Sequence, residues 1–359
     1  IGDAVLFSAM LRPIRDRFPG AKIDVLIRKP AQEIIKYNKN LDGIITYNAE
    51  NASNIITQEF APLKIARMLR RRNYDLVVTS EHAFRFILLS YLTGAKIRLG
   101  YDFEGRGFPL TVKVPYPEYP KRDRLELEYY LDLVRALGIN VRPKREWMEI
   151  KTSRTEEAFA RKFLAENGIA KNSLLVGIHA GGGIWKKRWP IYKYAKLADE
   201  LALRYGAKII LLGGTEDAAL YGQMLRIVGA RAQSKRLGNI VSAAGKASIR
   251  ETAAIVSKCD LVVCNDSAIS HIASAQGVRA IALFGVDSPK RWGPFGGISI
   301  MKHSRLPECS LLCNYDYLYA VDKCFDDKAP YCLNLISVED VMEKVASLAL
   351  RKTKRIRRN

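Results

Sequence analysis

The feature that most constrains this fold is a regular alternation of short apolar runs with longer amphipathic segments. Apolar runs of about four to eight residues between turn residues indicate buried strands, and apolar residues three and four apart indicate helices. Such an alternation predicts βαβ units, which build parallel sheets covered by helices on both faces. In the first half of the chain we expect strands at 22–27, 43–47, 74–79 and 96–100, and helices at 4–17, 31–37, 62–72, 84–92 and 124–137.

A second series of the same kind begins after residue 172. Residues 139–172 are charged and contain Pro143, and the periodicity changes there, so we place the domain link in this segment. The fold class is therefore α/β, with two doubly wound domains at 1–150 and 170–345 and a basic tail at 351–359. In the second domain we expect strands at 174–179, 208–212, near 240, 261–264 and 280–284, and helices at 190–205, 216–228, 249–258, after 267 and at 338–350.

The chain starts at Ile1, and Gly2 and Asp3 lead directly into the first helical pattern. A parallel α/β domain normally places a strand before its first helix. We therefore expect the first strand of the N-terminal domain to be missing from this sequence.

The polar residues 265–267 lie between a predicted strand and a predicted short helix. Ligands of open parallel sheets bind at the carboxyl ends of strands, and a helix N-terminus attracts anions such as phosphate. Asp266 or Ser267 is a candidate helix cap, and His271 follows Ser267 by one helical turn. On this stretch alone, a capped helix with a packed histidine and an anion site are equally good interpretations.

A second polar loop, residues 180–190, follows the predicted strand at 174–179. Gly181, Gly182 and Gly183 permit close approach of the backbone to a ligand, and Lys187 and Arg188 supply cations for a diphosphate. A solvated basic loop is the alternative. We rank phosphate binding above it because the loop lies at the carboxyl end of a strand.

The composition adds a preference for anionic partners. The 359 residues include 58 Lys and Arg against 37 Asp and Glu, a net charge of +21. Nucleic acid, an acidic membrane surface and phosphorylated substrates fit such a charge. We find no apolar run near the roughly 20 residues of a membrane-spanning helix and no secretory signal, so we expect a soluble cytoplasmic protein.

Taken in order, these motifs resemble glycosyltransferase family 9, the lipopolysaccharide heptosyltransferases. The resemblance extends over nearly the whole chain. It implies a GT-B architecture, two Rossmann-like domains facing across a cleft, and transfer of heptose from ADP-heptose with inversion. It implies neither a metal nor another cofactor. It rests on Gly2-Asp3, residues 74–78, 98–101, 104–106 and 130–133, His179 with its glycines, residues 187–190, Asn265-Asp266-Ser267 with His271, and residues 283–285.

The resemblance also implies roles for single residues. Asp3 matches the base that takes the proton of the acceptor hydroxyl, a step that inverting transfer requires. A plain helix cap is the alternative for Asp3. The implied donor-binding residues are Gly181, Gly182, Gly183, Lys187, Arg188, Glu251, Asp266, Ser267, Ala268 and His271.

Two assignments stay open at this point. Glu251 is a candidate for the donor ribose, but Ser248 and Glu251 also form a capping box, and we hold the two roles as equal. Glu81, His82 and Arg85 follow a predicted strand near the expected acceptor, and Arg85 is the best candidate for gripping an anionic group. The chain departs from the family pattern at Ala268, where glycine is usual, and a histidine common near residue 125 is not obvious.

Cys309, Cys313, Cys324 and Cys332 are clustered in sequence, but their spacing fits no standard zinc site. We therefore expect reduced thiols, with a structural metal as the less favoured alternative. The basic tail is expected to be a solvated segment, which could also bind weakly to an anionic leaflet.

The expected partners are a nucleotide sugar, with an ADP-sugar favoured, an anionic lipid-linked saccharide acceptor, and the cytoplasmic face of the inner membrane. Two other functions were weighed. One is a GT-B sugar-nucleotide epimerase or hydrolase, which would turn over the donor alone. The other is a nucleic-acid-binding protein, suggested only by the net charge; its aromatic and basic residues are too few along one face, so no nucleic acid is expected.

Overall fold

The computed structural model describes residues 1–47, 55–116, 124–231, 234–302, 325–326 and 329–356. The chain forms two compact units. One comprises Leu6–Trp147, and the other combines Ile1–Val5 with Met148–Asn359. The first five residues therefore belong to the unit that the later part of the chain builds.

The unit of residues 6–147 contains two small parallel sheets. Strands β1 and β2 pair with each other, and β3, β4 and β5 form the second sheet. Strand β5 was not predicted. The expected helix at 4–17 is interrupted at residues 8–10 by a 3-10 turn. Helix α1 Gly2–Phe7 begins in the larger unit and ends in this one. The strands are β1 Asp24–Arg28, β2 Gly43–Tyr47, β3 Leu76–Thr79, β4 Ile97–Asp102 and β5 Val112–Pro115, and the other helices are α2 Leu11–Arg17, α3 Gln32–Ile35, α4 Ile55–Arg70, α5 Phe84–Leu92 and α6 Glu126–Ala136.

The larger unit is built on a six-stranded sheet whose neighbouring strands all pair in parallel. Its spatial order is β11-β10-β9-β6-β7-β8. Numbered within this sheet and read from the other edge, the order is 3-2-1-4-5-6, that of a Rossmann dinucleotide-binding sheet. The strands are β6 Leu175–His179, β7 Lys208–Leu211, β8 Ile240–Ser242, β9 Leu261–Asn265, β10 Arg279–Phe284 and β11 Ile298–Met301, of which β11 was not predicted.

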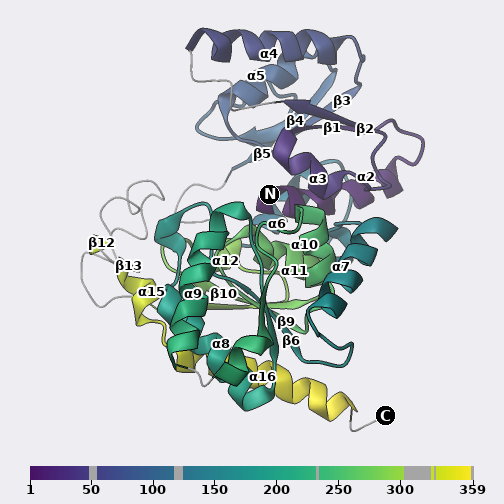
Figure 1. Cartoon of the computed structure of the whole chain (residues 1–359). Coiled ribbons are helices and arrows are strands. Elements are labelled where there is room, and N and C mark those ends of the chain that lie inside the picture. The colour runs from purple at the N-terminus through teal and green to yellow at the C-terminus, as the bar shows by residue number, and fades with distance from the viewer. Residues whose placement is uncertain (48–54, 117–123, 232–233, 303–324, 327–328, 357–359) are drawn as a thin grey trace. The chain divides into compact units, whose positions relative to one another are not determined.

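Helices pack on both sides of this sheet (Figure 1). Helices α7, α10 and α11 pack together in one group, and α8, α9 and α16 pack together in another. An antiparallel pair, β12 Phe325–Asp326 and β13 Ala329–Pro330, precedes α15. The helices of this unit are α7 Arg154–Glu166, α8 Ile191–Tyr205, α9 Ala218–Arg231, α10 Ile249–Val256, α11 Ala268–Ala275, α12 Pro289–Trp292, α15 Tyr331–Leu335 and α16 Val338–Ile356.

The two units divide between Trp147 and Met148, within residues 139–172 where we placed the domain link, but the same segment also contains helix α7, which was not predicted. Ser153 caps it through a complete capping box with Glu156, a signal that the sequence carried. Glu156 also pairs with the almost fully buried Arg250 of α10, at 2.8 Å between Oε1 and Nε. Arg250 donates a further hydrogen bond to the Lys151 carbonyl. The segment is therefore a folded part of the larger unit.

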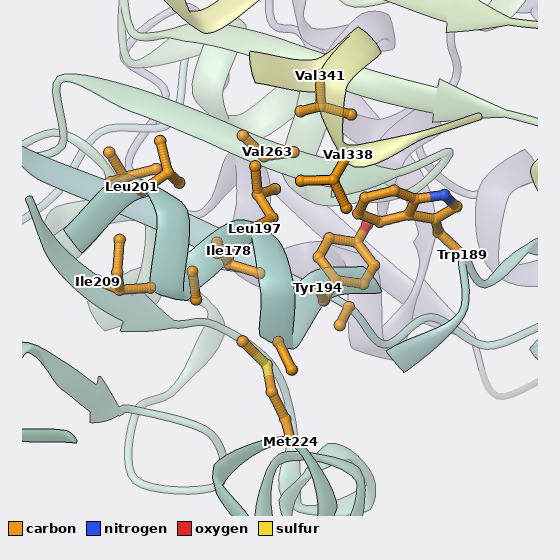
Figure 2. Close-up of a cluster of buried hydrophobic side chains, with 14 of the residues drawn as sticks. Ile178, Trp189, Tyr194, Leu197, Leu201, Ile209, Met224, Val263, Val338 and Val341 are labelled. Carbon is orange, nitrogen blue, oxygen red and sulfur yellow. The ribbon is translucent and has the colours of Figure 1, made fainter. Parts of the chain in front are cut away.

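The core of the larger unit also fixes the loop after β6. Trp189 and Tyr194 are fully buried and meet edge to face, with ring centroids 4.9 Å apart (Figure 2). The indole N–H of Trp189 donates to the Ile336 carbonyl at 3.0 Å, and Val338 of α16 packs in the same cluster. Burying two aromatic side chains in this way contributes several kcal/mol (roughly 1.5–3 for each large side chain). Residues 187 and 188, which directly precede Trp189, are thereby held at the end of the sheet.

None of the helices among the described residues is both long and apolar enough to cross a bilayer.

Candidate functional site

The candidate site lies where the strand order of the six-stranded sheet reverses. Strands β6 and β9 are neighbours at this point, and His179 pairs in register with Cys264. The loops that leave these two strands lead to helices on opposite faces, so their carboxyl ends frame the crevice in which Rossmann sheets bind ligands. The glycine loop after β6 and residues 266–267 after β9 meet there, as the sequence motifs required.

Asn265 joins the two loops. Its side-chain Nδ2 donates to the carbonyls of Ala180 and Gly181, both at 2.9 Å. Its Oδ1 accepts from the Trp189 N–H and from the Tyr194 hydroxyl, also both at 2.9 Å. Asn265 is almost fully buried, and all its hydrogen-bonding groups are used. The sequence motif alone indicates no role for Asn265, because its partners are brought to it only when β6 and β9 lie side by side.

Lys187 lies between two carboxylates. Its Nζ is 2.9 Å from Asp266 Oδ2 and also contacts Asp287, which follows β10. Burial alone would lower the pKa of Lys187, but the charges of Asp266 and Asp287 raise it above its usual value. The side chain is therefore a fixed ammonium at the end of the sheet. Asp287 is not recognisable as a site residue from the sequence, because only the strand order brings its loop beside Asp266.

Ser267 and Asp266 are not the helix caps that the sequence suggested. Ser267 occupies the N-cap position of α11, but its side chain caps no backbone N–H. Its hydroxyl instead lies 3.0 Å from Nδ1 of His179, and Nε2 of His179 lies 3.6 Å from the buried carboxylate of Asp217. The expected cap was wrong because the neighbouring strand β6 presents His179 to Ser267. The N-terminal amides of α11 thus have no side-chain cap from Ser267.

The glycines after β6 differ in their surroundings. A Cβ on Gly181 would overlap the carboxylate of Asp217, so only glycine fits there without rearrangement. Gly182 has a φ of +133°, which disfavours other residues, and its carbonyl accepts two hydrogen bonds from Arg188 at 3.1 and 2.5 Å. Gly183 is exposed and has open space around it. Arg188 therefore stabilises the conformation of the glycine loop. It does so with the guanidinium that the sequence predicted to contact a phosphate.

Asp3 lies beside the start of α11. A Cβ on Gly2 would be 3.1 Å from Cδ2 of His271 and 3.5 Å from Cα of Ala268, so Gly2 packs directly over this turn. His271 is buried, and its Nδ1 lacks a hydrogen-bond partner among the described residues. Burial lowers the pKa of His271 to about 4 although the charge of Asp3 opposes the shift, so the imidazole is neutral at pH 7. Asp3 itself is exposed. Residues 266–271 thus bring Asp3 and Lys187 to one region of the larger unit.

Glu251 has the structural role that was one of its two alternatives. Its Oε2 accepts from the Ser248 N–H at 2.7 Å, and its own N–H donates to the Ser248 hydroxyl at 3.3 Å. This capping box begins α10. A second role toward a ribose remains a prediction.

The three expected acceptor residues follow β3 in the smaller unit. His82 stacks on Tyr116 with ring centroids 4.7 Å apart and meets Phe103 edge to face. The Arg85 guanidinium lies over the ring of Phe86, 5.0 Å from its centroid. Glu81 and Arg85 are exposed.

In the part of the chain that the structure describes, no three His, Cys, Asp or Glu side chains are grouped as metal ligands. Cys332 is buried there, whereas Cys309, Cys313 and Cys324 lie outside the described residues. Cys259 and Cys264 are buried, and burial raises the pKa of the Cys264 thiol to about 12. The basic tail lies at the limit of the description: residues 351–356 continue α16, and 357–359 are not described.

Comparison with known proteins shows which family this sequence and fold resemble. The family model for glycosyltransferase family 9 (heptosyltransferase) matches residues 62–308. Lipopolysaccharide heptosyltransferase 3 of Escherichia coli is 24% identical over 295 residues, which are 82% of this chain and 83% of that protein.

Two solved structures share the fold. A glycosyltransferase family 9 protein from Veillonella parvula superposes with a TM-score of 0.78 and 24% identity, covering 98% of this chain and 95% of the other. The E. coli ADP-heptose lps heptosyltransferase II gives a TM-score of 0.73 and 20% identity, with coverage of 98% and 96%.

These findings confirm the family that the ordered motifs indicated and the α/β fold class with Rossmann-like units. The family match covers well over half of the sequence, including both strands of the switch point. The chain therefore belongs to glycosyltransferase family 9 and is a glycosyltransferase of the GT-B fold.

Proposed function

We propose that this glycosyltransferase moves a heptose from ADP-heptose, with inversion, onto a lipopolysaccharide core or a related lipid-linked saccharide. The observation that carries the proposal is the ammonium of Lys187 at the switch point of the Rossmann sheet. In transfer with inversion the leaving group is a nucleoside diphosphate. A fixed cation and free backbone amides stabilise the negative charge that develops on it. The relatives whose names specify heptose and lipopolysaccharide support the choice of sugar and acceptor.

The donor diphosphate is proposed to bind between the two loops. Lys187 would contact it, and the amides of Gly181, Gly182 and Gly183 and those at Ser267 and Ala268 would surround it. Asp266, Arg188 and Glu251 complete the proposed donor set. Nδ1 of His271 is a buried nitrogen without a partner among the described residues, so a ligand hydroxyl or phosphate there would satisfy it.

Asp3 is the proposed base. It takes the proton of the acceptor hydroxyl while that oxygen attacks the anomeric carbon and the bond to the diphosphate breaks. It lies in the first turn of α1, the end of a helix at which acidic side chains are favoured. Its neighbour His271 is neutral and does not hold the carboxylate in an ion pair.

Acceptor binding is assigned to Glu81, His82 and Arg85. Glu81 and His82 lie between β3 and α5, and Arg85 lies in the first turn of α5, so all three follow the carboxyl end of a strand of the smaller unit. The exposed guanidinium of Arg85 offers planar, paired N–H groups for a phosphate or carboxylate of the acceptor.

Peripheral binding at the cytoplasmic face of the inner membrane belongs to the same proposal. The buried sides of α4 and α5 pack together over β1 and β2. Residues 63–72 and 84–98 contain five and three basic residues, respectively, and no Asp or Glu. Near an anionic leaflet each such cation contributes about 1 kcal/mol. The exposed apolar side chains on the same segments are Leu63, Met68, Phe84, Leu88, Tyr91 and Ile97.

Calorimetric titration tests the donor site. ADP, UDP, ADP-heptose and a UDP-sugar are titrated into the wild type and into Lys187→Ala. A hydrogen bond to a charged group contributes about 1.5–3 kcal/mol, so the affinity for ADP should fall roughly 10- to 150-fold. Lys196→Ala, which removes an exposed lysine of the same unit, is the matched control and should bind like the wild type. Equal binding by Lys187→Ala would refute the donor assignment.

A second assay tests the base. Asp3→Asn should lower kcat by about 10²- to 10⁴-fold and leave the Kd for ADP unchanged, because a general base acts on the acceptor. Asp16→Asn, an exposed carboxylate on α2, is the control. An unchanged transfer rate would remove Asp3 as the base. Donor turnover at an equal rate without acceptor would contradict transfer and favour hydrolysis or epimerisation.

A further inference from the structure

Asp266 and Asp287 share one cation in a nearly buried cluster. The side chains of Lys187, Asp266 and Asp287 are 18%, 10% and 11% exposed, respectively. With both aspartates ionised, the three groups carry one net negative charge. This charge lies where the proposed donor site must receive a ligand that is itself negative.

The cluster is built by three neighbouring strands. Lys187 follows β6, Asp266 follows β9, and Asp287 follows β10, and these strands lie in the order β10-β9-β6. Both carboxylates contact Nζ of Lys187, so the two groups lie close to each other. A hydrogen bond between them requires a proton, because two ionised carboxylates can only accept.

Among the described residues, the other charged or titratable groups of β6, its loop and α11 that lie near the cluster have different partners or are neutral. Arg188 of the same loop donates to the Gly182 carbonyl, and His179 lies between Ser267 and Asp217. His271 of α11 is neutral at pH 7. We therefore expect a proton to neutralise the second carboxylate of the cluster.

We propose that Asp266 and Asp287 together bind one proton when a nucleoside diphosphate binds to Lys187. The inference rests on the proposed function of the site. A diphosphate adds at least two negative charges beside two carboxylates and one ammonium, and like charges in a site of low dielectric cannot all stay ionised. One carboxylate takes a proton from the solvent and, as a carboxylic acid, donates to the other, which frees Lys187 for the phosphate.

The proton affinity of the cluster is already close to what this requires. Burial raises the pKa of Asp266, Lys187 lowers it, and the hydrogen bond and charge of Asp287 raise it again, to about 7. The ligand's added charge would raise the proton affinity of the pair further. Asp287 is thus a positioning residue that holds Lys187 in the free protein and accepts or shares a proton in the complex.

Calorimetry of ADP binding tests the inference directly. At pH 7.5 and above, the terminal phosphate of ADP is almost fully ionised, so proton uptake measured in buffers of different ionisation enthalpy reports on the protein. The wild type should take up close to one proton per ADP. Its Kd should rise by up to about tenfold between pH 7.5 and 8.5, as linkage to one proton requires.

Two variants give the expected contrast. Asp287→Asn should take up little or no proton and bind ADP with a nearly pH-independent Kd, and Asp287→Glu should restore the uptake. Glu339→Gln removes an exposed carboxylate at the start of α16 and should behave like the wild type.

The inference is overturned if the wild type binds ADP without proton uptake, or if Asp287→Asn takes up as many protons as the wild type. In either case the proposed donor site stands. If the wild type binds neither ADP nor ADP-heptose, the proposed function fails and this inference with it. The wild-type proton count does not depend on whether a variant folds.

Discussion

Replacing Asn265 should disturb both the stability of the larger unit and its donor site. Asn265→Ala removes the four hydrogen bonds that join residues 180–181, Trp189 and Tyr194. Each buried hydrogen bond contributes about 0.5–1.5 kcal/mol, so the free energy of unfolding should fall by roughly 4 kcal/mol. For a domain of about 150–250 residues, this lowers Tm by roughly 8–16 °C.

The isosteric change Asn265→Asp separates packing from hydrogen bonding. The Asp side chain still accepts from Trp189 and Tyr194, but it loses both donations to the Ala180 and Gly181 carbonyls. As a carboxylate it places an acceptor opposite these two carbonyls and buries a charge without a cation, so we expect the free energy of unfolding to fall by at least as much as with alanine. Both variants should weaken ADP binding, because the glycine loop loses its attachment to β9.

Thermal unfolding followed by tryptophan fluorescence measures these changes, since Trp189 is buried against the network. Asn334→Ala, at an exposed position of α15, is the control and should unfold like the wild type. If Asn265→Ala lowered Tm by less than about 2 °C and left the Kd for ADP unchanged, the network would not hold the site together, and the reasoning would be wrong.

Further predictions concern a buried ion pair, a glycine and the basic surface. In the wild type, Arg250 lowers the pKa of Glu156 to about 2. Glu156→Gln keeps an oxygen for the capping box but loses the negative charge that faces Arg250. In urea unfolding at pH 7 the cost should be about 2–3 kcal/mol. Because the pKa of Glu156 is lower in the folded protein than in the unfolded chain, the stability difference between wild type and variant should be largest above the ordinary pKa of a glutamate. It should vanish as pH falls toward 2. A stability difference that does not change with pH would contradict the pairing with Arg250. Gly181→Ala forces Asp217 to move, so the free energy of unfolding in the same assay should fall by about 1–3 kcal/mol and ADP binding should weaken. Wild-type stability and affinity would show that the loop can accommodate the added methyl group. Arg71→Glu should reduce co-sedimentation with vesicles of anionic lipid, measured against neutral vesicles. Unchanged co-sedimentation would argue against membrane binding through residues 63–72 and 84–98.

The sequence alone predicted most of what depends on the order of elements along the chain. Lys187 and Asp266 were each assigned to the donor site, and each follows a predicted buried strand; the structure pairs the two side chains. Residues whose roles depend on which strands are neighbours were missed. Asp287 and the bonding of Asn265 become visible only when β10, β9 and β6 are placed side by side.

Local signals were also read incompletely. Helix α7 carries a complete capping box at Ser153, but its charged exterior led us to treat the segment as a link. Strand β11 is short, with only four residues at the edge of the sheet, so its apolar pattern is weak. Ser267 has the residue type of a cap, yet its hydroxyl faces a histidine from another strand.

The grouping of residues 1–5 with residues 148–359 has a consequence for how the protein is made. Gly2 packs against His271, some 270 positions away in sequence, while residues 6–147 form a continuous unit between them. Because closing so long a loop costs entropy before any contact is gained, this step should come late in folding. A ribosome-bound chain can fold its middle unit early, but the proposed base reaches its neighbours only after α11 has been synthesised.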